Sequence, residues 1–226
     1  MNPDDETMVL DAAEIRALGS LVEKAITTPD YYPLSLNALV NACNQSSNRE
    51  PVVDYGEPTV LRALEGLRNR KLVFVFEGAT SRVVKYGQKF AEALGLSQAE
   101  TAALCVLMLR GPQTPGEIRG RSGRLHEFAS LGEVESTLQS LAVRSPQPLV
   151  SKLPRQTGFK ESRFAHLLGG PPVAAAPESD QAAPALIGVA APEPDRIADL
   201  TQEVEALRGE LAELKTQFAD LKRQLE

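Results

Sequence analysis

Apolar side chains recur at helical spacing in three stretches near the start of the chain. The first begins at Asp11 and stops at Pro29, the second follows Ser35, and the third begins near Pro58. Residues three, four and seven positions apart lie on one face of a helix, so each stretch predicts an amphipathic helix with one buried side. Two runs rich in β-branched and aromatic residues, LVFVFE and SRVVKYG, then flank Gly78 and predict a β-hairpin.

The same order of elements repeats further along the chain. At Ser97, Thr114 and Ser130 a hydroxyl residue precedes a Glu by three positions, the spacing of a capping box at a helix start. Two later runs, LVSKL and FKESRFAH, predict a second hairpin. Helix, helix, helix, hairpin is the order of a winged helix. We therefore expect a mainly α protein with small β-hairpin wings (α+β), built from two tandem winged-helix domains.

The buried stripes of the two third helices support this repeat. Both stripes place apolar residues at the first, fifth and eighth positions: Val60, Leu64 and Leu67, and then Val134, Leu138 and Leu141. Each unit has about 75 to 80 residues, a size that folds alone only marginally. We therefore expect the two units to pack on each other.

Five segments follow from this reading. Residues 1–8 are expected to be a disordered N-terminus, 9–90 the first winged-helix domain, and 91–168 the second. Residues 169–195 form a Pro/Ala-rich linker without aromatic or basic residues, a composition typical of a disordered or semi-extended segment. Its apolar stretch ALIGV is either plain linker or a docking segment. Residues 196–226 have the pattern of a leucine-zipper-like coiled coil.

The heptad pattern of residues 196–226 is the clearest signal in the chain. Apolar residues recur every seven positions in two series offset by three, as the a and d positions of a coiled coil do. They predict a dimerisation seam made of Ile197, Leu200, Val204, Leu207, Leu211, Leu214, Phe218, Leu221 and Leu225. The alternative is a single amphipathic helix folded back on its own chain, but the narrow seam favours a coiled coil.

The charges beside the seam favour a parallel arrangement. In a parallel pair Glu203 faces Arg208 of the partner helix, and Glu210 faces Lys215. An antiparallel pair would replace these attractions with like-charge contacts. We therefore expect a parallel homodimer. A trimer, and a coiled coil with a different protein, remain alternatives.

Two stretches resemble a known family. CNQSSNREPVVDYGEPTVLRALEGLRNRKLV and LRGPQTPGEIRGRSGRLHEFASLGEVESTL are similar to the YceH-like bacterial family of unknown function. The resemblance covers about residues 8–168 and implies a tandem winged-helix fold, without an established activity. A serine-type cap is common in that family near position 56. Gly56 departs from it and predicts a weaker helix start.

The third helix of the first unit carries the first set of candidate DNA contacts. Thr59, Arg62, Gly66 and Asn69 are predicted opposite its buried stripe, and an arginine there can pair with a guanine edge. Glu57 and Glu65 flank this face, so a bare solvated face or a protein-binding face is the alternative. The candidate nucleic-acid-binding residues of this unit are Arg49, Thr59, Arg62, Asn69, Lys71, Arg82 and Lys85.

The second unit carries a basic cluster in the sequence RGRSGRLH. Arg119, Arg121 and Arg124, next to His126, suit phosphate oxygens. They equally suit bidentate pairs with carboxylates of the first unit. The third helix of this unit turns Glu135, Ser136, Gln139 and their neighbour Glu133 outward, which makes it a poor DNA reader. We expect the second unit to have a supporting or docking role rather than to contact DNA bases.

The net charge of the chain bears only weakly on the prediction of DNA binding. The chain carries a formal charge of −6, which at first argues against nucleic acid. Most of the excess acid lies in residues 169–226, so the globular part is close to neutral. A near-neutral globular part is weak ground for strong nonspecific DNA binding, because such binding scales with the phosphates neutralised.

The sequence lacks the motifs that would indicate a membrane protein, a secreted protein, a metal site or an enzyme. No apolar run is long enough for a membrane span, and the acidic N-terminus is unlike a secretory signal, so we expect a cytoplasmic protein. Cys43 and Cys105 lack a CxxC context and are expected to be small, buried, reduced residues. Spaced metal ligands, a phosphate-binding loop and a nucleophile with a base are all missing. We expect no metal, no cofactor and no catalysis.

Two functions remain open at this point. The first is DNA binding, possibly as a transcriptional regulator, by a homodimer joined through residues 196–226. The second is a protein-interaction scaffold that uses the winged units and the coiled coil without touching DNA.

Overall fold

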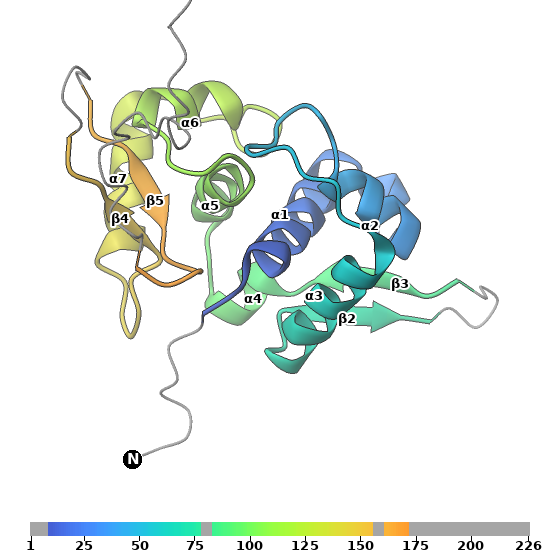
Figure 1. Cartoon of the computed structure of the whole chain (residues 1–226). Helices are drawn as coiled ribbons and strands as arrows, with labels where there is room; N and C mark the ends of the chain where they lie inside the picture. Colours follow the sequence, from blue (N-terminus) through green and yellow to red (C-terminus); the bar gives the residue numbers. More distant parts are fainter. Residues whose placement is uncertain (1–8, 78–82, 156–160, 172–226) are drawn as a thin grey trace, which may run out of the picture. The chain divides into compact units, whose positions relative to one another are not determined.

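Helices and two small antiparallel sheets alternate in the computed structural model, which describes residues 9–77, 83–155 and 161–171 (Figure 1). The first half contains α1 (Ala12–Thr27), the 3₁₀ turn η1 (Pro29–Tyr31), β1 (Leu34–Ser35), α2 (Leu36–Cys43), α3 (Glu57–Asn69), β2 (Val73–Phe76) and β3 (Lys85–Gln88). The second half contains α4 (Phe90–Leu94), α5 (Gln98–Arg110), α6 (Pro115–Arg121), α7 (Leu131–Ala142), β4 (Val150–Lys152) and β5 (Phe164–His166). The predicted mixture of helices with small β-hairpins is confirmed. The predicted disordered N-terminus (1–8), residues 172–195 of the predicted linker and the whole predicted coiled coil lie outside the described residues.

Side-chain caps begin most of the longer helices where the sequence predicts them. Asp11, Ser97 and Thr114 each accept a hydrogen bond from the backbone of a Glu three residues on, and that Glu carboxylate accepts one in return. Such a reciprocal box satisfies two backbone N–H groups that the helix itself leaves unpaired. Gly56, at the start of α3, supplies no side-chain cap, as predicted, and Pro58 occupies the first turn instead.

The sheet of the first half has three strands in the order β1–β3–β2, all antiparallel. The two-residue strand β1 is missed by sequence reasoning because it is too short to show a period-2 pattern. Inside the hairpin, Phe74 stands opposite Gly87. A Cβ on Gly87 would collide with the Phe74 ring, so the glycine makes room for the aromatic side chain across the strand pair.

The second sheet is smaller and has two strands. β4 pairs antiparallel with β5, from Val150 opposite His166 to Lys152 opposite Phe164. Gln113 extends this sheet by one bridge, since its N–H donates to the Phe164 carbonyl at 3.0 Å and its carbonyl accepts from the Phe164 N–H at 2.8 Å. The bridge ties the segment before α6 to the hairpin.

Helix α5 lies at the centre of the core. All of its residues from Glu100 to Leu109 are buried, because α1 covers one side while α7 and β5 cover others (Figure 1). The backbones of α1 and α5 come close at Gly19, where a Cβ would stand 3.0 Å from the Leu109 side chain. The two halves therefore share one core along α1 and α5.

Both cysteines lie in this core. Cys43 and Cys105 are buried free thiols, as predicted. Burial raises the pKa of both thiols, so each behaves as a small apolar residue.

Candidate functional site

The outer face of α3 is the first candidate site. Val60, Ala63, Leu64 and Leu67 point into the core, and the opposite face exposes Pro58, Leu61, Arg62, Glu65, Arg68 and Asn69. Within the described part of the chain, the side chains of Arg62 and Arg68 make no hydrogen bond or ion pair. Both guanidinium groups are therefore available to a ligand.

Two residues predicted on this face lie at its flank instead. Thr59 is half-buried, and a Cβ on Gly66 would collide with the Glu14 carboxylate of α1. That carboxylate also pairs with Arg70 at 2.9 Å. The prediction that Gly66 lies on the outer face is wrong, because the first turn of α1 packs against this flank of α3.

The remaining candidates of the first half have different positions. Lys71 follows Arg70, the C-cap residue of α3, is exposed, and has a positive φ of 59°. Lys85 is half-buried at the start of β3. Arg82 lies outside the described residues. α3 and the hairpin lie next to each other, so the exposed residues of α3 and the strand ends share one region of the molecule (Figure 1).

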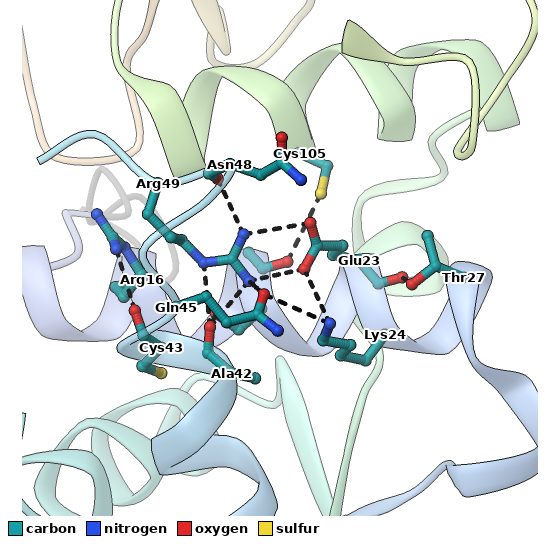
Figure 2. A network of polar contacts seen from close by, with 12 residues as sticks. Arg16, Glu23, Lys24, Thr27, Ala42, Cys43, Gln45, Asn48, Arg49 and Cys105 are labelled. Atoms are coloured by element: carbon teal, nitrogen blue, oxygen red, sulfur yellow. Dashed lines mark hydrogen bonds and ion pairs between the residues drawn. The ribbon is translucent and has the colours of Figure 1, made fainter. Parts of the chain in front are cut away.

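Arg49 is not a surface residue. Its side chain is fully buried and binds both oxygens of the Glu23 carboxylate, at 3.2 and 2.6 Å. The same guanidinium donates to the carbonyl oxygens of Ala42 and Asn48 and to Gln45 Oε1 (Figure 2). Its donors are thus satisfied inside the protein, so the prediction that Arg49 binds the DNA backbone is wrong.

These contacts fasten the loop 44–56 that leads into α3. Arg16, also buried, donates to the carbonyl oxygens of Cys43 at 3.1 Å and Pro51 at 2.6 Å. The Glu50 N–H donates to the Leu109 carbonyl of α5 at 2.8 Å. Because α1 and α5 both hold this loop, they set the position at which α3 begins.

A polar pocket of about 410 Å³ lies beside this network. Its walls come from α1, the loop 44–56, α5 and α6, so both halves of the chain contribute. Four of its lining side chains are cationic, Lys24, Arg110, Arg121 and Arg124, and one, Glu23, is acidic. The Glu23 charge is already neutralised by Arg49.

The basic cluster of the second half is partly engaged in local contacts. Arg119 donates to the carbonyl oxygens of Phe128 and Ala129, and Arg121 contacts Gln113 and Glu117. For these residues the described structure contains no ion pair with carboxylates of the first half. Arg124 is exposed and has no partner among the residues described.

Comparison with known proteins places the chain in a family. A family model described as "Protein of unknown function, DUF480" matches residues 10–159. The chain belongs to this family. A UPF0502 protein of Opitutus terrae is 57% identical over 208 residues, covering 91% of this chain and 86% of that protein. One from Solibacter usitatus is 54% identical over 217 residues, covering 96% and 98%. The resemblance predicted from the two stretches is thereby confirmed, and none of these names states an activity.

In this DUF480 protein the outer face of α7 differs from that of α3. Glu135, Ser136 and Gln139 are exposed, as predicted, and α7 contains no Lys or Arg. Glu133 accepts a hydrogen bond from the Ala129 N–H at 2.7 Å and contacts His126 at 3.3 Å. The first of these contacts, followed by the second, lowers the pKa of Glu133, so the start of α7 stays anionic.

Sequence reasoning misses the residues that complete the pocket, Glu23, Lys24 and Arg110. They stand on two helices far apart along the chain, and each looks like an ordinary charge at a helix surface. The one available signal is the long polar loop NQSSNREPVVDYG, because a loop of that length usually serves a purpose.

Among the described residues, no three His, Cys, Asp or Glu side chains gather into a possible metal site. In the same part of the chain, no helix has the length and apolarity needed to cross a membrane.

Proposed function

We propose that this protein is a non-enzymatic, cytoplasmic DNA-binding protein made of two tandem winged-helix units, and that it acts as a regulator. The order helix, helix, helix, hairpin in both halves supports the winged-helix assignment. So does β1, which adds a third strand to the hairpin of the first half, between the first two helices.

The observation that carries the proposal is the pair of unengaged arginines on the outer face of α3. Arg62 lies near the middle of this face, and a guanidinium can bind guanine O6 and N7 together in the major groove. Arg68 and the nearby Lys71 are exposed cations, and side chains of this kind can bind phosphate oxygens. Glu57 and Glu65 disfavour indiscriminate contact with phosphates, so we expect modest affinity that depends on sequence.

A protein-binding role is the second candidate, and exposed apolar side chains favour it. Val52, Leu61 and Phe76 are 58%, 43% and 48% exposed. Leu61 stands on the same face as Arg62, where it suits a protein surface as well as a thymine methyl group. In this role α3 and the hairpin would join a partner without contacting DNA.

Dimerisation through residues 196–226 is part of the proposal. The a and d seam and the Glu–Arg and Glu–Lys pairs favour a parallel homodimer. Two heads on flexible arms raise each other's effective concentration on DNA. We expect deletion of 196–226 to give a monomer with folded heads in light scattering and circular dichroism. A truncated protein that stays dimeric would place the interface elsewhere.

The test of DNA binding is fluorescence anisotropy of the full-length protein with pooled genomic duplexes, at low and near-physiological salt. Arg62→Ala should weaken binding about tenfold, in line with about 1–3 kcal/mol for one bidentate base contact. Ser136→Ala, at the corresponding position of α7, is the matched control and should bind like wild type. Equal losses in both variants, or no binding by wild type at either salt, would reject the DNA role in favour of the protein-binding one.

A further inference from the structure

The pocket between α1, the loop 44–56, α5 and α6 has the charge of an anion site. Lys24, Arg110, Arg121 and Arg124 line it, and its one acidic lining residue, Glu23, lies 2.6 Å from Arg49 and 3.6 Å from Lys24. Burial, followed by the charge of Arg121, lowers the pKa of Arg110. Cations held close together in a partly buried place favour an anion between them.

Unused hydrogen-bond donors accompany this charge. A guanidinium carries five N–H donors. Arg110 contacts Asn48, Arg121 contacts Gln113 and Glu117, and the described structure gives Arg124 no partner. The lining arginines thus keep donors that their described neighbours do not use. Planar forks of this kind match the oxygens of a phosphate group.

Room is available next to these donors. Gly120 and Gly123 line the pocket on either side of Arg121, and a Cβ on either glycine would meet nothing within 4 Å. The volume of about 410 Å³ lies in the range of small-molecule sites. Val106, Leu109 and Leu125 add an apolar part to the wall, which can receive the organic portion of a ligand beside its phosphate group.

The geometry points to a binding site for a small phosphate-bearing molecule in this pocket. Arg110, Arg121 and Arg124 bind the phosphate group, Lys24 adds charge, and the apolar wall receives the rest of the molecule. The site is separate from the outer face of α3 and stands whether or not α3 binds DNA. Gln45, Ser47 and Asn48 of the loop 44–56 also line it, so an occupant contacts the segment that leads into α3.

The test uses the full-length protein with pyrophosphate as the probe, at constant ionic strength. Titration calorimetry should show binding to wild type, and scanning calorimetry should show a higher Tm, because a ligand bound only by the native state stabilises it. Arg124→Gln should weaken binding about tenfold or more. That side chain is exposed and has no described partner, so this variant is expected to fold normally.

Two further variants make the result specific. Gly123→Asp places a carboxylate in open space beside the arginines and should abolish binding. Arg62→Gln removes an exposed arginine outside the pocket and should leave pyrophosphate affinity unchanged. The proposal is overturned if wild type does not bind, if Arg124→Gln binds as tightly as wild type, or if Arg62→Gln loses as much affinity as Arg124→Gln.

Discussion

Helices α3 and α7 each precede the hairpin in their half of the chain, yet they show different surfaces to solvent. Their buried stripes correspond residue by residue, Val60 with Val134, Leu64 with Leu138 and Leu67 with Leu141. On the outside, Arg62 corresponds to Ser136 and Leu61 to Glu135. The buried stripe is set by packing against the core and the outer face is not, so two helices with matching stripes can present different surfaces to solvent.

The two halves also differ in the anchored loop before α3. Removing its anchor, Arg49, should have the largest effect on stability. Arg49→Ala removes a fully buried guanidinium and leaves the half-buried Glu23 carboxylate and the Ala42 carbonyl without their main partner. Breaking a buried pair in this way costs about 3–5 kcal/mol of unfolding free energy. Urea denaturation followed by circular dichroism measures it. Arg68→Ala, an exposed arginine on α3, should stay within about 0.5 kcal/mol of wild type, and a similar small loss in both would contradict the anchoring role.

The two hairpins differ in the hydrogen bonding of the polar side chain at one end of the strand pair. Gln88 stands opposite Val73, and its side-chain Oε1 accepts hydrogen bonds from the N–H groups of Phe90 and Ala91. His166 stands opposite Val150, and its buried Nδ1 has no partner in the described structure. Burial lowers the pKa of His166 to about 4, so the folded protein holds the ring neutral where the unfolded chain binds a proton.

This His166 difference should make stability depend on pH. Its contribution is complete above the ordinary pKa of about 6.5 and is lost as the pH falls from there to about 4. The loss should be on the order of 2–3 kcal/mol. Urea unfolding of wild type and His166→Gln at pH 7.5, 5.5 and 4.5 checks it. The variant should lose less stability than wild type between the first and last pH, and parallel losses would show that His166 does not titrate as described.

The middles of the hairpins offer a third contrast. Phe74 lies over Gly87 in the first hairpin, whereas Ser151 stands opposite Ala165 in the second. Gly87→Ala forces a methyl group into the Phe74 ring and should cost about 1–3 kcal/mol. Adding Phe74→Leu should recover part of this loss in a double-mutant cycle of thermal unfolding. Additive losses would mean that the two residues do not share the space.

The smallest expected effect concerns the helix starts. Ser130 caps α7 with its hydroxyl, and Gly56 holds the corresponding place before α3 without a side-chain cap. Gly56→Ser should stabilise by a few tenths of a kcal/mol and Ser130→Gly should destabilise by a similar amount. Precise thermal melts of both variants test the pair. Shifts of the same sign would show that something other than capping governs these positions.

Local signals account for what could be predicted, and tertiary contacts account for the rest. Asp11, Ser97 and Thr114 act within one helical turn, so their caps can be read from the chain. The strand β1 and the helix α4 are too short to show a period. In the sequence Arg49 resembles an exposed loop cation, because nothing local shows that Glu23 of α1 pairs with it in the fold. Helical spacing alone puts Gly66 on the outer face of α3. Spacing does not reveal that Glu14 of α1 packs beside it.

In the candidate sites, too, local geometry could be predicted and tertiary contacts could not. The outward position of Arg62 and Asn69 followed from helical geometry alone. The pocket could not be predicted in this way, because its cations come from α1, α5, α6 and the turn after α6, and they meet only when the two halves pack. Sites assembled from distant helices leave no spacing in the sequence to recognise.

The close approach of α1 and α5 at Gly19 makes this fold a poor source of interchangeable modules. A chain cut after residue 90 would strip α5 from α1 and expose the apolar sides of both, because α5 is buried along its whole middle. Neither half can then be transplanted, duplicated or lost by itself without a new covering for that surface. A rearrangement that keeps both halves together preserves this shared surface, although the repeat along the chain suggests two separable parts.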